Sequence, residues 1–255
     1  MFRIVRIGIL LFLLVMVFVG AWQAKKRTTS WQQTVHAVVF PINADASAET
    51  QRYIAGLQES DFDPVEQFIE HEAAHYGIKL YRPIDLEIAP QVHSLPPPVI
   101  DSRSFLDVTL WSLKLRWWAW RNADWHGRRP DLRLFVLYHD PATHQRLDFS
   151  VGIQPGQIAL VKAYAGKKFN GDNNVILTHE MLHTLGATDK YDYSSLQPFF
   201  PEGYANPEWR PLYPQEQAEL MGGRIPSSQN RSEIPRSLDQ TMIGELTARE
   251  IGLIR

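Results

Sequence analysis

The segment formed by residues 175–186 constrains the fold of this chain more than any other part of the sequence. It is apolar on nearly every side, yet it contains two histidines and a glutamate in the order His-Glu-Met-Leu-His. Such a segment predicts a buried helix, and burying these three polar side chains without partners would cost on the order of several kcal/mol. A metal ion with its bound water would remove that cost. We therefore expect this helix to lie in the core and to hold a metal.

The spacing of the polar residues in this segment favours zinc. Positions i and i+4 share one face of a helix, so His179 and His183 can both bind a single zinc ion. Glu180 follows the first histidine directly, and from there it can reach a zinc-bound water and act as the general base. The predicted cofactor is thus Zn2+, with two of its ligands on one helix.

A third ligand is expected just beyond the end of this helix. Gly186 lies where a left-handed glycine would end the helix, and Asp172 or Asn173 could cap its other end. The turn at the glycine bends the chain back, so that Asp189, three residues later, can meet the metal. Asp192 is the alternative third ligand, but the spacing favours Asp189.

The same five-residue pattern occurs earlier in the chain, at residues 71–75. It belongs to a predicted helix over residues 63–76, with Asp63 as its N-cap. The apolar side chains of this helix form one stripe, His71 lies off that stripe, and no third ligand follows at a suitable spacing. We expect a surface helix with two solvated histidines, although Glu72 lies close to the apolar stripe without an evident partner.

Composition excludes several classes of protein. The chain has 255 residues, of which 44% are apolar and 21% charged, as is ordinary for a single globular domain. The net charge of −2 gives no strong positive field, so nucleic acid is not an expected partner. The absence of cysteine excludes disulfides, thiolate metal sites and a thiol nucleophile. Any metal must therefore be bound by His, Asp or Glu.

Residues 1–27 are predicted to be a membrane anchor that is separate from the fold. Residues 7–22 carry no charge, with arginines before them and a basic cluster at residues 25–27 after them. This predicts an uncleaved N-terminal transmembrane helix, with a cleaved signal peptide as the alternative. Residues 28–33 are expected to form a linker. The common arrangement would place the domain outside the cytoplasm, although the basic cluster argues against it.

The rest of the chain, residues 34–255, is predicted to form a single α+β domain. A mixed twisted sheet with packed helices would make up an N-terminal lobe over residues 34–186, and an irregular C-terminal lobe would span residues 187–255. Strands are expected at residues 35–40, 84–88, 132–139, 146–153 and 157–164, and helices at residues 48–57, 63–76, 104–121, 174–185 and 247–254.

The predicted helix at residues 104–121 contains four tryptophans among basic residues. It is either an amphipathic helix packed on the core or a helix that lies on a membrane surface near the anchor. Because tryptophans usually serve packing, we favour the first interpretation.

Residues 179–189 resemble the zinc signature of the metzincin clan of metallopeptidases, in the variant with Asp as third ligand. The clan also has a methionine-containing turn below the metal, and residues 220–223 are the matching segment, with Met221 as its methionine and Met242 as the competitor. The resemblance implies a zinc metalloendopeptidase with the three ligands and the general base named above. The remainder is similar to uncharacterised bacterial membrane-anchored proteins, which implies a single-pass protein of a bacterial inner membrane with its domain outside the cytoplasm.

The resemblance also implies where a peptide or protein substrate would bind. In the clan the substrate lies extended along an edge strand of the sheet, which by element order is the strand at residues 146–153 here. Several members stabilise the oxyanion with a tyrosine just after the methionine, where this chain has Gly223. The tyrosines that could replace it are Tyr191, Tyr193, Tyr204 and Tyr213.

Two other functions remain open at the level of sequence. One is a non-catalytic, zinc-containing module that binds a partner at the membrane. The other is a metal-dependent hydrolase of non-peptide amides or esters. A fourth protein ligand would indicate the first, because structural zinc sites are closed by protein whereas catalytic sites keep a water.

Overall fold

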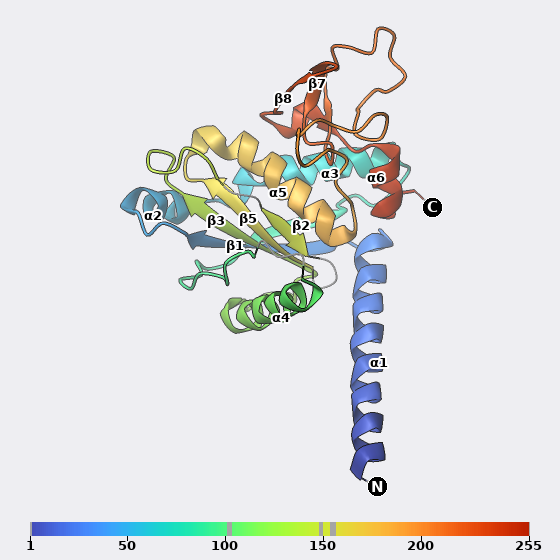
Figure 1. Cartoon of the computed structure of the whole chain (residues 1–255). Helices are drawn as coiled ribbons and strands as arrows, with labels where there is room; N and C mark the ends of the chain where they lie inside the picture. The colour runs from blue at the N-terminus through green and yellow to red at the C-terminus, as the bar shows by residue number, and fades with distance from the viewer. Residues whose placement is uncertain (1, 101–103, 148–149, 154–156, 255) are drawn as a thin grey trace.

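A five-stranded sheet forms the centre of the computed structural model, which describes residues 2–254 apart from 101–103, 148–149 and 154–156 (Figure 1). The strand order is β2-β1-β3-β5-β4, in which the first four strands are parallel and β4 is an antiparallel edge strand. The strands are β1 (Val35–Asn43), β2 (Ile84–Ile88), β3 (Leu132–His139), β4 (Val151–Ile153) and β5 (Ile158–Tyr164). The predicted α+β fold with a mixed sheet is confirmed, although β4 covers only the end of the strand expected at 146–153, of which residues 148–149 lie outside the described residues.

Helices cover both faces of this sheet. In Figure 1, α3 and α5 lie on one face and α4 on the other. The helices are α1 (Phe2–Thr29), α2 (Ala48–Ala55), α3 (Asp63–His75), α4 (Phe105–Asn122), α5 (Asn170–Leu185) and α6 (Glu245–Glu250). Because both faces are covered, successive residues of a strand enter different cores. In β1, Val39 packs in the core below α3 and α5, whereas Val38 and Phe40 pack in the core below α4.

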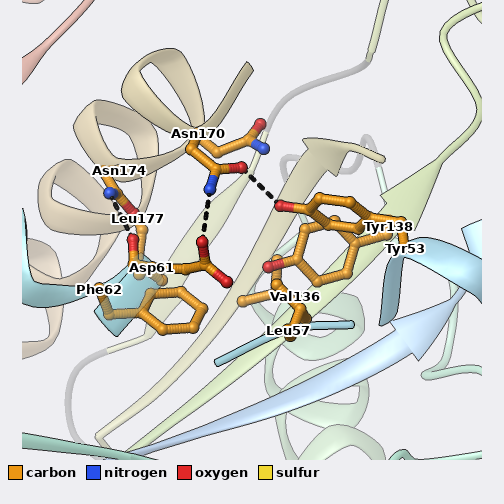
Figure 2. Close-up of a pocket in the computed structure, with 10 residues that line it drawn as sticks. Tyr53, Leu57, Asp61, Phe62, Val136, Tyr138, Asn170, Asn174 and Leu177 are labelled. Atoms are coloured by element: carbon orange, nitrogen blue, oxygen red, sulfur yellow. Dashed lines mark hydrogen bonds between the residues drawn. The ribbon is translucent and has the colours of Figure 1, made fainter. Parts of the chain in front are cut away.

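Helix α5 begins four residues earlier than predicted, and tertiary contacts explain its start. No side chain caps it, and the predicted caps lie inside its first turn. Instead, Asn170 Nδ2 donates to Asp61 Oδ1 at 3.0 Å, and Asn174 Nδ2 donates to Asp61 O at 2.9 Å (Figure 2). Tyr53 Oη donates to Asn170 Oδ1 at 2.7 Å. These hydrogen bonds, which border the small pocket drawn there, tie α5 to the 3-10 turn η1 (Glu59–Asp61) before α3.

The C-terminal lobe is short of regular structure, as expected, but it contains small paired elements. Strand β6 runs parallel to β9, and β7 forms a hairpin with β8. These strands are β6 (Ala218–Glu219), β7 (Ile225–Ser228), β8 (Arg231–Glu233) and β9 (Thr241–Met242), with 3-10 turns η2 (Lys167–Phe169) before α5 and η3 (Leu238–Gln240) before β9. The closing helix α6 begins at Glu245 and is shorter than the helix predicted at 247–254.

Helix α1 extends away from the domain, and its last turn is bound to the domain (Figure 1). Arg27 Nη2 donates to Asp131 Oδ2 at 3.1 Å, Thr28 is buried, and Trp31 Nε1 donates to Ile251 O at 2.8 Å. Within the segment predicted to be a linker, residues 28–33, the helix continues to Thr29, and Trp31 is buried against the core.

Among the residues that the structure describes, no helix combines the length and the apolar character needed to cross a membrane. The N-terminal helix is present as predicted, whereas its transmembrane character is not supported.

Candidate metal centre

The ligands predicted from the sequence come together at the C-terminal half of α5. His179 Nε2 and His183 Nε2 lie 3.1 Å apart, and each lies 3.1 Å from Asp189 Oδ1. Asp189 reaches them because Gly186 ends α5 with a φ of 117°, a left-handed conformation that glycine adopts readily. Three possible ligand atoms from two stretches of chain thus form an equilateral triangle.

Both imidazole rings are held with Nε2 toward this triangle. His179 Nδ1 lies 3.0 Å from Leu220 O, and His183 Nδ1 lies 2.8 Å from Ala187 O. A carbonyl oxygen can only accept, so each Nδ1 carries a proton and donates it, which leaves Nε2 of the neutral ring as an acceptor. Two nitrogen lone pairs and one carboxylate oxygen therefore face the same place.

This arrangement fits a zinc ion. Zinc binds His nitrogen and Asp oxygen at about 2.0–2.2 Å in a tetrahedron, which separates neighbouring ligand atoms by about 3.3 Å. In addition, Asp189 Oδ1 and Glu180 Oε2 are buried and have no hydrogen-bond partner within the described part of the chain. Buried acceptors without partners are costly, and a cation with a bound water would satisfy both atoms.

Glu180 is positioned by α5 and by the edge strand β4. Its side chain is buried, and burial raises the pKa of its carboxyl group, as suits a general base. Gly152 in β4 lies beside that carboxyl group, since a Cβ on this glycine would be 3.4 Å from Glu180 Oε2. A Cβ at Gly152 would lie 2.5 Å from His183 Cβ and 2.6 Å from Glu180 O, so only glycine allows β4 to approach α5 this closely. The sequence analysis missed Gly152, although an isolated strand glycine signals such an approach.

The second carboxylate oxygen of Asp189 is bound by a tyrosine. Tyr193 Oη donates to Asp189 Oδ2 at 2.6 Å, and this bond raises the pKa of Tyr193 to about 12. Burial alone would raise the pKa of Asp189, but the two histidine rings beside Oδ1 and the hydrogen bond from Tyr193 to Oδ2 hold it far below the usual range. Burial lowers the pKa of His179, yet the carboxylate of Asp189 and the charge of Glu180 outweigh burial and raise that pKa to about 9, so that a cation bound at the triangle would displace this proton. Asp189 is therefore an ionised and oriented carboxylate.

Two of the four tyrosines proposed for the oxyanion lie at this site. The ring of Tyr191 lies 6.5 Å from the ring of His179 and 5.3 Å from that of Tyr193, measured between centroids. Tyr204 and Tyr213 instead pair with each other, with 2.9 Å between their hydroxyl oxygens. The structure therefore narrows the candidates to Tyr191 and Tyr193.

The predicted methionine turn contacts His179 through its backbone. Its first residue, Leu220, supplies the carbonyl that faces His179. Met221 is fully buried in the main core, and its carbonyl accepts a bond from Lys190 N at 2.9 Å, which ties the turn to the segment after Asp189. Met242 lies in β9 and is half-buried.

A buried glutamate holds this turn in place. Glu219 accepts hydrogen bonds from Gly222 N at 2.7 Å, Gly244 N at 3.1 Å and Thr247 Oγ1 at 2.7 Å. Burial raises the pKa of Glu219, and the three donors compensate in part. The carboxyl group thus links the methionine turn to the start of α6. Nothing in the local sequence pattern signals this contact, because its partners come from later segments of the chain.

Asp192, the alternative third ligand, serves a turn instead. Its Oδ1 accepts bonds from Ser194 N at 3.0 Å and Ser195 N at 2.8 Å. Bonds from the Ser194 side chain and the Ser195 backbone lower the pKa of Asp192 to about 2. This is the local Asx-turn geometry that aspartate often adopts in loops.

The first His-Glu-Ala-Ala-His copy does not converge on a ligand set. His71 and His75 are exposed on α3, as predicted, and the helix includes Asp63 as its first residue rather than as its cap. Glu72 is buried, and its missing partner is Ile243 N, which donates to Glu72 Oε2 at 2.8 Å. Burial raises the pKa of Glu72. This glutamate therefore joins α3 to the C-terminal lobe.

Within the described residues, one other group of possible ligands lies on the sheet, at His36, Asp85 and Glu87. His36 Nε2 lies 2.8 Å from Glu87 Oε2, and Asp85 Oδ1 lies 3.0 Å from Arg82 Nη2. Both carboxylates thus already have partners, whereas Asp189 Oδ1 and Glu180 Oε2 at the α5 site have no hydrogen-bond partner among the described residues.

Comparison with known proteins adds no assignment. No model of a known protein family matches the chain, and no curated protein is significantly similar to it. The resemblance to the metzincin signature thus rests on the residues themselves.

Proposed function

We propose that this chain is a zinc-dependent metallopeptidase that hydrolyses peptide bonds. The observation that carries the proposal is the triangle of His179 Nε2, His183 Nε2 and Asp189 Oδ1 with sides of 3.1 Å. Three ligands on one side of a buried site leave a fourth position for water, which is the pattern of catalytic zinc. Glu180 beside that position supports hydrolysis over a purely structural role.

The chain's own residues would divide the chemistry among them. When bound, zinc would supply Lewis-acid activation of a water and of the substrate carbonyl. Glu180 would accept the proton of the attacking water and later pass it to the leaving nitrogen. Tyr193 would orient Asp189 through the bond to Oδ2. Tyr191, with its ring beside His179, is the better placed donor for the oxyanion, because Tyr193 is already engaged with Asp189.

The edge strand supports a peptide as substrate. Strand β4 pairs with β5 on one side and ends the described sheet on the other. An extended peptide could add to this edge through main-chain hydrogen bonds. Because Gly152 of β4 contacts Glu180, a peptide on this edge would lie beside the general base.

A closed, non-catalytic zinc site is the second candidate. One carboxylate oxygen of Glu180 lies within 4.8 Å of a ring nitrogen of both His179 and His183. If Glu180 itself became the fourth ligand, no position would remain for water, and the domain would serve as a zinc-stabilised binding module. Hydrolysis of non-peptide amides or esters would use the same site as the first proposal.

The test compares one substitution in the two copies of the motif. The purified chain should contain one zinc by elemental analysis. Glu180→Gln should keep that zinc and lose activity on casein or a peptide library by about 10²–10⁴-fold, because an amide cannot accept the proton. Glu72→Gln is the matched control and should keep both metal and activity. A Glu180→Gln protein as active as the parent would refute the mechanism, and four protein ligands without any cleavage would favour the closed site.

We further propose that α1 holds the protein at a membrane, with the domain outside the cytoplasm. Exposed apolar side chains on α1 support this: Phe12, Val15, Met16, Val19 and Trp22. Membrane fractions should contain a chain that still starts near Met1. Recovery of a soluble form that starts near Lys25 would indicate a cleaved signal peptide instead.

A further inference from the structure

Helix α4 packs on the sheet with one face only. Leu115, Trp118 and Ala119 are buried in the core on that side of the sheet. The ring of Trp118 lies 4.9 Å from that of Phe135 in β3, and Trp118 Nε1 donates to Ser94 Oγ at 3.0 Å. The packing role favoured from the sequence is therefore correct for this face.

The opposite face of α4 carries an apolar stripe that nothing in the described chain covers. Its members are spaced alternately four and three residues apart, which aligns them along one side of a helix. Their exposed fractions lie between 56% and 77%, far above what packing on a core would give. The members of this outer stripe are Leu106, Leu110, Leu113, Trp117 and Trp120.

Basic residues border the outer stripe. Lys114 and Arg121 are exposed along one flank, which begins with Asp107 in the first turn. The Arg121 guanidinium lies 5.8 Å from the centroid of the Trp117 ring. Leucine and tryptophan flanked by lysine and arginine are typical of helices that lie in a bilayer interface. In such helices the aromatic rings lie at the level of the headgroups, and the basic side chains contact anionic lipid. A second protein as partner would not require this basic border.

The direction of α1 indicates which side of the domain faces lipid. In Figure 1, α1 leaves the domain on the α4 side of the sheet and runs across the direction of α4. The domain cannot turn freely about α1, because Arg27 pairs with Asp131 and Trp31 donates to Ile251 O. A surface that receives the exposed apolar side chains of α1 would therefore also meet the outer stripe.

We propose that the outer stripe of α4 docks on a lipid surface, with the helix lying in the plane of the interface. The zinc site lies across the sheet, on the face covered by α5, so docking would turn it away from the lipid (Figure 1). The partner of the outer stripe is therefore the interfacial region of a bilayer that contains anionic lipid. This proposal does not depend on hydrolysis at the metal centre.

The absence of cysteine gives a direct test in the full chain. Leu113→Cys would carry a spin label in protein reconstituted with vesicles of phosphatidylethanolamine and phosphatidylglycerol. Ile234→Cys is the control, because Ile234 is equally exposed and follows β8 on the opposite side of the sheet. Collisions of each label with oxygen, which concentrates in lipid, are compared with collisions with a water-soluble nickel chelate.

The label at Leu113→Cys should show an oxygen-to-nickel ratio several-fold above that of Ile234→Cys, and the two ratios should agree without vesicles. Leu106→Cys provides a second site on the stripe, and unchanged zinc content shows that each variant has folded. Equal ratios at both sites in vesicles would overturn the proposal. A Leu113→Cys label shielded from both reagents would overturn it as well, because a second copy or another protein would then cover the stripe.

Discussion

Substituting Gly152 with alanine tests the contact between the edge strand β4 and helix α5. The new Cβ would lie 2.5 Å from His183 Cβ and 2.6 Å from Glu180 O. Carbon atoms in good contact lie about 3.5–4.0 Å apart, so β4 or α5 must move by about 1 Å. Overpacking of this kind costs about 1–3 kcal/mol, while the loss of glycine from the unfolded chain returns about 0.4–1 kcal/mol. We expect a net loss of about 1–2 kcal/mol.

The matched control is Gly56→Ala at the end of α2. A Cβ there would lie 3.6 Å from the carbonyl oxygens of Arg52 and Tyr53, which is ordinary contact, and its φ of −101° suits alanine. This variant should keep the stability of the parent to within about 0.5 kcal/mol. Urea unfolding of the metal-free proteins measures both values, since metal binding would otherwise add to the free energy of unfolding.

Zinc affinity and hydrolysis provide a second measurement of the contact between Gly152 and α5. A shift of about 1 Å at His183 and Glu180 should weaken zinc binding and reduce hydrolysis by up to about 10²-fold, since misplaced groups lose their alignment with the substrate. Parent-like stability and parent-like zinc affinity in Gly152→Ala would refute the reasoning, because they would mean that β4 does not press on α5.

Two further predictions concern carboxylates. Asp189→Ala should weaken zinc binding strongly, whereas Asp192→Ala should leave it near the parent's value, as measured by competition with a chelator; equal losses would show that the third ligand is misassigned. Burial alone would raise the pKa of Asp131, but the bonds from Arg27 and from the His36 backbone lower it. This carboxylate should therefore add stability above its unfolded pKa of about 4 and lose it as the pH falls through the lower folded value. Asp131→Asn should flatten the acid side of a plot of unfolding free energy against pH, and an unchanged slope would contradict the assignment.

Much of the fold is determined by local sequence pattern. The strand at residues 132–139 has the same bounds in sequence and structure, because an apolar run with aromatic and β-branched side chains follows a proline and fills both cores. The end of α5 at Gly186 and the exposure of His71 and His75 follow equally from local chemistry. Such features can be predicted from sequence because the residues that cause them and the structure that they form lie within one turn or one strand.

The convergence of the candidate ligands was also accessible from the sequence, because His179, His183 and Asp189 lie within eleven residues of each other and one helix with one turn brings them together. What surrounds them was decided only by the tertiary structure. Leu220 supplies a carbonyl to His179 from another segment, and Gly152 reaches Glu180 from the sheet edge. Such contacts depend on how distant segments pack, which no local periodicity encodes.

Helix α4 shows most clearly which features follow from the sequence and which follow from tertiary packing. Its sequence has apolar residues on more than one side, which is compatible both with a core helix and with a helix at a membrane surface. In the structure, the face of α4 that contains Trp118 packs against Phe135 in β3 and is buried. The outer stripe, with Trp117 and Trp120, therefore remains exposed. The sequence by itself determined that this helix is rich in apolar and basic side chains. Which of them enter the core was decided by the tertiary structure, because a single sheet can bury only one face of a helix.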